Sequence, residues 1–253
     1  MLDLQKGNMW KRISAFLCDI ILLFVVITGI ASLTAWVVDI DSHFDEYTAV
    51  REEYAHMYNI DLEADTSGYT EEELQEYNAK CDAADAAFAE DERALRSWSM
   101  LITLIPVIVT VSVFLGYLIM EFIIPLWLKE GRTLGKKIFG LCVMRVDGVR
   151  VSNVQMFVRT VLGKFTVGTM IPLTFLALII LNVASVVAPV GIIAIFGVQV
   201  IMMISTKNHD TIPDKMAGTV VVDNASQMIF ESEEELVAYK KRLAAERAER
   251  SPY

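Results

Sequence analysis

Apolar residues fall into three long blocks along this chain, and polar residues fill the stretches between the blocks. The blocks run over residues 13–38, 100–128 and 165–204. A helix crosses the hydrocarbon core of a bilayer with about 20 residues, so each of the first two blocks predicts one transmembrane helix. The third block is too long for one crossing and predicts two shorter helices, with a turn near residues 182–191, where Pro189 and Gly191 interrupt the apolar pattern. We therefore expect four transmembrane helices.

The polar stretch between the first two blocks predicts an antiparallel helical hairpin. Its aromatic and aliphatic residues recur at helical spacing on both sides of a break around residues 65–70. Thr70 and Glu73 have the spacing of a capping box, which marks the start of a helix. The apolar stripe is either the hairpin's own core or part of a surface that binds a partner or attracts cations.

The polar stretch after the second block predicts a small β element followed by an interfacial helix. Residues 141–151 alternate around Asp147-Gly148, a dipeptide that accepts the backbone angles of a tight hairpin turn. Residues 219–223 could add a third strand in a register that the pattern does not define. Ser152 and Gln155 form a second capping box, which begins an apolar helix that also carries basic residues, as expected at a lipid surface.

Composition identifies a membrane protein and argues against a nucleic-acid-binding protein. Hydrophobic residues make up 54% of the chain and the mean hydropathy is +0.44. The net charge is −10, and residues 39–99 hold 18 acidic and 4 basic residues. A protein that binds nucleic acid needs a basic surface to replace the phosphate counterions, and this chain is acidic overall.

The positive-inside rule gives the expected orientation. Lys6, Lys11 and Arg12 precede the first apolar block. The segment after the second block is basic too, with Lys129, Arg132, Lys136, Lys137, Arg145, Arg150, Arg159 and Lys164. Both regions should be cytoplasmic, which places the acidic hairpin on the extracytoplasmic side and both termini in the cytoplasm. We expect the membrane to be a bacterial-type cytoplasmic (inner) membrane.

The predicted architecture is an all-α membrane protein with a small cytoplasmic β element. Its order is the N-terminus with the first transmembrane helix (1–38), the acidic extracytoplasmic hairpin (39–99), the second transmembrane helix (100–128), the basic cytoplasmic segment (129–164), the third and fourth transmembrane helices (165–204), and a cytoplasmic tail (205–253) that ends in a charged amphipathic helix.

Two carboxylates interrupt the apolar blocks, Asp19 in the first and Glu121 in the second. Both should lie about 10–12 Å from the cytoplasmic ends of their helices, at one level. A buried carboxylate needs a partner, so the two acids either share a proton, hold a cation between them, or pair with an arginine such as Arg159 or Arg132. Tyr117 lies one turn before Glu121 and could donate a hydrogen bond to it. The alternative is that these groups only join helices.

The sequence gives no sign of a cofactor, a metal site or an enzyme. Cys18, Cys81 and Cys142 lie in an apolar, an acidic and a basic segment, and His43 and His56 match no metal motif. The segment from Gly131 to Lys137 is one residue too short for a phosphate-binding loop and lacks its hydroxyl residue. No hydroxyl or thiol has an identifiable base nearby.

Several short motifs occur in a fixed order along the chain. They comprise Arg12, Ala15 and Asp19; then Thr133, Gly135, Lys136, Gly140, Val143, Asp147 and Gly148; then Arg159; and finally Asp214, Ala217, Gly218 and Thr219. Together these motifs resemble the RDD family of membrane proteins over residues 9–38 and 100–223. The family is named for one arginine and two aspartates, which here would be Arg12, Asp19 and Asp214.

The resemblance implies several membrane helices, no established catalytic chemistry, and a part in the transport of ligands that the family leaves undefined. Pro213 stands where the family often has histidine, which weakens a proton relay at that position, and Glu121 is not part of the motif. Asp214 either begins a turn by accepting backbone N–H bonds or pairs with Arg12 or Arg159.

We expect ion- or proton-coupled transport or permeation. In this hypothesis Asp19 holds a monovalent cation or a proton, Glu121 shares it, and Arg12, Arg159 and Asp214 organise the cytoplasmic mouth. The bilayer is one partner, and a second copy of the chain would help to enclose a pathway. The alternative is a non-catalytic assembly or sensing protein that binds partners through the hairpin and the tail.

Overall fold

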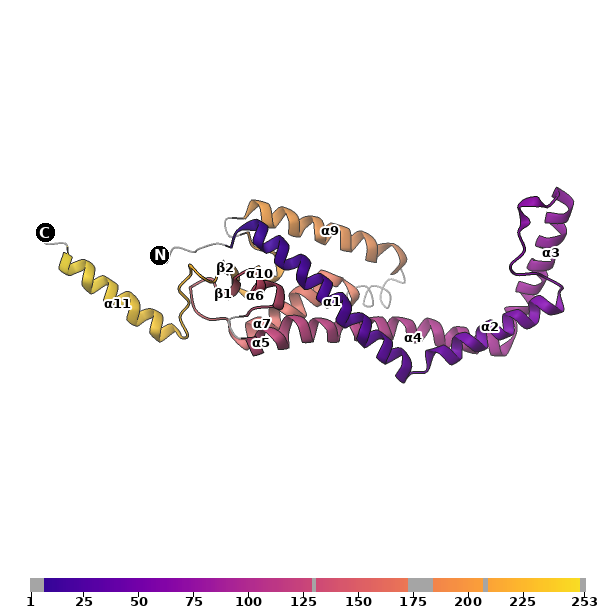
Figure 1. Cartoon of the computed structure of the whole chain (residues 1–253), viewed down its shortest axis with the longest axis horizontal. Coiled ribbons are helices and arrows are strands. Elements are labelled where there is room, and N and C mark those ends of the chain that lie inside the picture. The colour runs from indigo at the N-terminus through magenta and orange to yellow at the C-terminus, as the bar shows by residue number, and fades with distance from the viewer. Residues whose placement is uncertain (1–6, 129–130, 173–183, 207–208, 251–253) are drawn as a thin grey trace. The chain divides into compact units, whose positions relative to one another are not determined.

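The first two apolar blocks form long helices, as predicted. The computed structural model describes residues 7–128, 131–172, 184–206 and 209–250 (Figure 1). Within these residues two helical stretches are long and apolar enough to cross a membrane. One is Met9–Val37 (α1), and the other is Glu92–Leu128, which comprises Glu92–Tyr117 (α4), Leu118–Ile123 (η2) and Ile124–Leu128 (α5). The chain divides into two compact units, one of residues 29–112 and one that joins residues 1–28 to residues 113–253.

The third apolar block differs from the prediction at Pro189 and Gly191. Helix α9 (Ala184–Ser205) continues through both residues, so the chain does not turn at either of them. Proline and glycine interrupt helices in water, but a helix in an apolar environment retains its remaining backbone hydrogen bonds because no water competes for them. Residues 173–183, in which the other half of this block falls, lie outside the described residues.

The unit of residues 29–112 contains the hairpin helices, Ile40–Met57 (α2) and Glu71–Phe88 (α3), with a short 3₁₀ helix at Thr66–Gly68 (η1) between them. The capping box predicted at Thr70 and Glu73 is present. Tyr47 packs edge-on against Phe88, with ring centroids 5.2 Å apart, and also contacts Trp98. At least part of the apolar stripe is therefore the core of this unit.

The second unit is built around a two-stranded antiparallel sheet, Leu141–Arg145 (β1) with Thr219–Asp223 (β2). The turn at Asp147-Gly148 forms, and Gly148 has the positive φ of 96° that the turn needs. The second arm of the predicted hairpin is reduced to one bridge between Met144 and Arg150, because Ser152 begins a helix two residues later. The segment of residues 219–223 is the main partner of β1.

Both faces of this sheet are buried, which explains its apolar sequence. One face packs Leu141, Val143 and Val221 against Ala15 of α1. The other face forms a cluster with Ile229 that contains Cys142, Met144, Val220 and Val222. The sheet thereby fixes the N-terminal end of α1 to the segments around it.

Short helices surround the sheet, and two stretches adopt the wide π-helical winding. The short helices are Ile124–Leu128 (α5), Leu134–Ile138 (α6), Asn153–Phe157 (α7) and Ile212–Ala217 (α10), and Glu233–Arg250 forms the predicted charged helix (α11). The π-helices are Leu118–Ile123 (η2) and Val158–Gly168 (η3). π-Helical turns are rare and occur frequently at functional sites.

Close packing of η3 on α10 makes Gly163 sensitive to substitution. A Cβ atom at Gly163 would lie 2.7 Å from the Pro213 Cα atom, whereas one at Gly168 would meet nothing nearer than 3.6 Å. We expect Gly163→Ala to lower the free energy of unfolding by about 1–3 kcal/mol and Gly168→Ala to leave it nearly unchanged. Thermal unfolding in mild detergent measures this difference, and equal melting temperatures for the two variants would contradict the packing.

Candidate functional site

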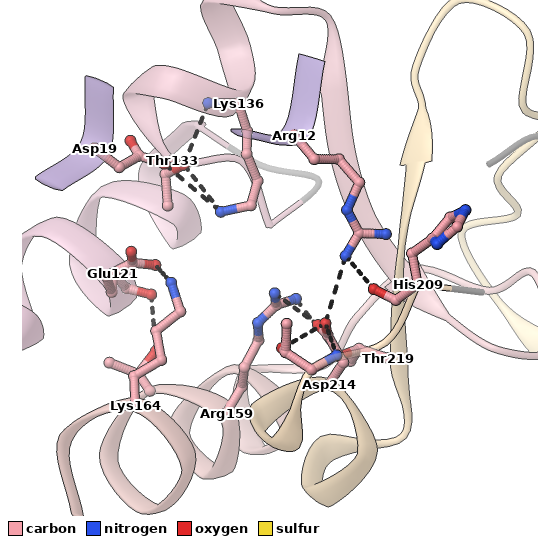
Figure 2. Close-up of polar contacts among 12 residues, drawn as sticks. Arg12, Asp19, Glu121, Thr133, Lys136, Arg159, Lys164, His209, Asp214 and Thr219 are labelled. Atoms are coloured by element: carbon pink, nitrogen blue, oxygen red, sulfur yellow. Dashed lines mark hydrogen bonds and ion pairs between the residues drawn. The ribbon is translucent and has the colours of Figure 1, made fainter. Parts of the chain in front are cut away.

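Three buried carboxylates and four basic side chains line one cavity of about 450 Å³ in the second unit (Figure 2). The carboxylates belong to Asp19, Glu121 and Asp214, and the basic groups belong to Arg12, Lys136, Arg159 and Lys164. These side chains come from α1, η2, α6, η3 and α10. The cavity therefore collects charged groups from segments that are far apart in the sequence.

Asp19 is held by the first turn of α6. Its carboxylate accepts hydrogen bonds from the Thr133 hydroxyl at 2.5 Å and from the Gly135 backbone N–H at 2.7 Å. The Lys136 ammonium lies 3.7 Å from the same carboxylate. Only glycine fits at position 135, because a Cβ atom there would lie 2.3 Å from the Ala15 carbonyl oxygen. The glycine-containing loop thus binds a carboxylate of this chain.

Glu121 lies on η2 and pairs with Lys164 of η3, with 2.5 Å between the Lys164 Nζ and Glu121 Oε2 atoms. The Thr160 hydroxyl donates to the Glu121 backbone carbonyl at 2.8 Å. A π-helical turn shifts the backbone hydrogen bonds by one residue, and here a side chain of the facing π-helix contacts one of its carbonyls. The two π-helices therefore meet at the Glu121 carboxylate and at its backbone.

Asp214 has the most complete set of partners and is only 1% exposed. It forms an ion pair with Arg159 at 2.7 Å and a longer one with Arg12 at 3.8 Å. It also accepts hydrogen bonds from the Thr211 N–H at 2.9 Å and the Thr211 hydroxyl at 2.7 Å. Both interpretations of Asp214 hold at once, since it caps a turn and it pairs with both arginines.

The charge state of Asp214 follows from these partners. Burial alone would raise the pKa of its carboxyl group, but Arg159, Thr211 and Arg12 together outweigh burial and lower that pKa below the ordinary value of 3.8. Asp214 is therefore ionised at neutral pH.

Lys136 is a basic group of the cavity whose pKa is strongly lowered. Burial lowers the pKa of its ammonium group to about 8, and the neighbouring positive charge of Lys164 contributes to the decrease. The carboxylates of Glu121 and Asp19 act in the opposite direction. A lysine with this pKa exchanges its proton near physiological pH.

The structure brings the predicted site residues together but pairs them differently from the sequence hypothesis. Asp19 and Glu121 line the same cavity, and each is paired with a lysine, Lys136 or Lys164. Arg159 pairs with Asp214 and not with either acid of the apolar blocks. Within the described residues Tyr117 makes no hydrogen bond to Glu121, although it lines the cavity with it.

Sequence reasoning missed Thr133, Lys136 and Lys164 as partners of the buried acids. The available signal was Thr133, a residue type that commonly caps the start of a helix. Its side chain caps α6 and donates a hydrogen bond to Asp19, and Lys136 follows it by three residues. No comparable signal connects Lys164 to Glu121, which is 43 positions earlier. Among the described residues no cluster of three or more His, Cys, Asp or Glu side chains could hold a metal ion.

Comparison with known proteins identifies the family of this chain. The sequence profile described as the RDD family matches residues 6–218, which include all seven charged residues of the cavity. The chain belongs to the RDD family. RDD proteins are membrane proteins, and the arginine and two aspartates expected for this RDD chain, Arg12, Asp19 and Asp214, all line its cavity. Neither the curated proteins nor the solved structures gave a match.

Removing the Asp214 charge should destabilise this RDD protein strongly. Asp214→Asn leaves Arg159 buried without its nearest counter-charge, and we expect a loss of about 3 kcal/mol in the free energy of unfolding at neutral pH. Asp147→Asn is the matched control, because Asp147 also pairs with an arginine but its side chain is 41% exposed, and it should lose less than about 1 kcal/mol.

At strongly acidic pH, Asp214→Asn and the unmodified protein should have nearly the same free energy of unfolding. A carboxyl group with a lowered pKa contributes stability above its unfolded-state pKa, and that contribution is lost as the pH falls through the lower folded-state value. Thermal unfolding across a pH series measures the gap. A gap that stays constant from neutral pH to strongly acidic pH would show that the Asp214 charge is not its cause.

Proposed function

We propose that this RDD protein moves a small solute across the cytoplasmic membrane and couples that movement to a proton at its cavity. The observation that supports the proposal is the cavity itself, in which buried carboxylates face lysines and one lysine, Lys136, has a pKa of about 8. Ionisable groups inside membrane proteins are rare and commonly mark the routes of ions and protons.

A proton fits the contacts of the two acids better than a bound alkali cation does. The carboxylates of Asp19 and Glu121 already contact donors, including an ammonium group each. A monovalent cation at either position would have to displace that ammonium group. A proton needs no such displacement, because it can leave or join Lys136 while Asp19 keeps its hydrogen bonds from Thr133 and Gly135.

The topology that we propose for this activity has four membrane crossings with both termini in the cytoplasm. The two long apolar helices and α9 supply three of the crossings, and the fourth is expected in the first half of the third apolar block. The basic segments belong inside by the positive-inside rule. The acidic hairpin of residues 39–99 then lies outside. In this topology the cavity lies near the cytoplasmic ends of the crossings.

One observation favours the alternative of an assembly or sensing protein. Residues 29–112 form a compact unit of their own, with a core that includes Ile40, Leu101 and Ile108. Such a unit could bind a partner independently of the cavity. We propose no catalytic reaction, because the cavity pairs its acids and bases with one another.

Proton flux through reconstituted vesicles tests the proposal. Vesicles loaded with the pH dye pyranine report proton movement under an imposed pH gradient and, separately, under a sodium gradient. We expect Lys136→Met and Asp19→Asn to lower the flux at least about tenfold, because they remove the exchangeable proton or its partner. Lys136→Arg should also lower it while it retains the charge, since arginine does not release a proton in this pH range.

Lys137→Met is the matched control, because Lys137 is the next residue of α6 and is exposed. Its flux should equal that of the unmodified protein. The proposal fails if the unmodified protein gives no more flux than empty vesicles under both gradients, or if Lys136→Met and Asp19→Asn conduct normally. A stoichiometric partner that is lost on removal of residues 41–98 would favour the alternative.

A further inference from the structure

The described lining of the cavity carries one more positive than negative group. Its carboxylates are those of Asp19, Glu121 and Asp214, against four basic side chains. Two of the ion pairs are close, those of Lys164 with Glu121 and of Arg159 with Asp214. Lys136 and Arg12 lie farther from their carboxylates, at 3.7 Å from Asp19 and 3.8 Å from Asp214. Arg12 also donates a hydrogen bond to the His209 backbone carbonyl at 2.7 Å, whereas Lys136 donates to the Thr133 hydroxyl at 3.1 Å. Lys136 is therefore the more loosely held of these two cations.

Most of the remaining lining residues are apolar, although Tyr117, Gln199 and Thr211 also line the cavity. Helices α1 and α9 supply much of this apolar wall, with Phe16, Leu17, Ile20, Phe196, Val200 and Met203. Phe16 and Leu17 are about half exposed, so this wall is open on the α1 side. The cavity thus combines a cluster of charged groups with an apolar wall, and its volume lies within the usual range of small-ligand sites.

We propose that this cavity binds an amphiphile with an acidic headgroup, a carboxylate or a phosphate monoester or diester, and a hydrocarbon tail. The headgroup contacts the Lys136 ammonium, and the tail lies against the apolar residues of α1 and α9. The inference rests on the proposed function and names the class of solute that the protein moves. A cationic solute is disfavoured, because it would add to a lining that is already positive.

Binding of such an anion is linked to the proton on Lys136. The charged groups that face this ammonium are Asp19 on α1, Glu121 on η2, and Arg159 and Lys164 on η3. The two cations disfavour its charge, and an acidic headgroup beside them offsets that repulsion. The anion therefore binds best while Lys136 is protonated, and the proton is held most firmly while the anion is bound.

Fluorescence titration of the full chain in phosphatidylcholine nanodiscs tests the inference without any gradient. The probe is dansyl-undecanoic acid, and its methyl ester is the uncharged control. We expect saturable binding of the acid and at least tenfold weaker binding of the ester. Between pH 7 and pH 9 the affinity for the acid should fall about tenfold, because Lys136 loses most of its charge on passing pH 8.

Variants separate this role from a structural one. Lys136→Met should bind weakly at both pH values, Lys136→Arg should bind tightly at both, and Lys137→Met should keep the pH dependence of the unmodified protein. Loss of the pH dependence in Lys136→Arg with retained affinity is a result that damage to the fold does not produce. Equal binding of the acid and the ester, or normal pH-dependent binding by Lys136→Met, would overturn the inference.

Competition identifies the source of the headgroup. Displacement of the probe when phosphatidylglycerol replaces part of the nanodisc lipid indicates a bilayer lipid, and displacement by inorganic phosphate indicates recognition of the headgroup alone. Binding of the probe that resists both supports a single-chain amphiphile. Flux in vesicles without binding of the acid would reject this inference and leave the proposed function standing, whereas binding without flux would reject the transport step.

Discussion

A carboxylate removed from water must find a counter-charge or a set of donors, and this constraint organises the cavity unit. Asp19, Glu121 and Asp214 are each less than 9% exposed, and each is satisfied by groups from another segment of the chain. These contacts join α1 to α6, η2 to η3, and α10 to both η3 and α1. A helix end, two π-helices and a two-stranded sheet are placed so that the contacts can form. The buried acids thus determine which segments lie together.

The same pairing decides what chemistry the cavity can perform. Two acids facing each other would share a proton or trap a cation, but here each acid pairs with a lysine, and the pKa of one of these lysines, Lys136, is lowered by burial. Lys136 is the more loosely held of the two, at 3.7 Å from its carboxylate compared with 2.5 Å for Lys164. A site with a labile proton, an excess of positive charge and an apolar wall is suited to an acidic amphiphile more than to a metal cation.

The sequence predicted local features well because short-range geometry determines them. The capping boxes at Thr70 and Ser152 and the turn at Gly148 all form, and the two long apolar helices are present. The family motif identified Arg12, Asp19 and Asp214. Partners across the fold were predicted only in part. The pairing of Asp214 with Arg12 and Arg159 was one of two alternatives, and residues 219–223 were expected as a strand. The contact of Lys164 with Glu121 and the register of β1 with residues 219–223 follow no spacing rule. Pro189 and Gly191 do not interrupt α9, because the rules by which these residues break helices come from helices in water.

The coupling between Glu121 and Lys164 is the most direct test of this account. A double-mutant cycle with Glu121→Gln, Lys164→Gln and the combined variant, measured by unfolding in mild detergent, isolates the pair from the rest of the cavity. If paired charges organise the cavity, the two side chains should be coupled by about 1 kcal/mol or more, and the combined variant should be more stable than the sum of the single losses predicts. Additive losses, with a coupling within about 0.3 kcal/mol of zero, would contradict the account.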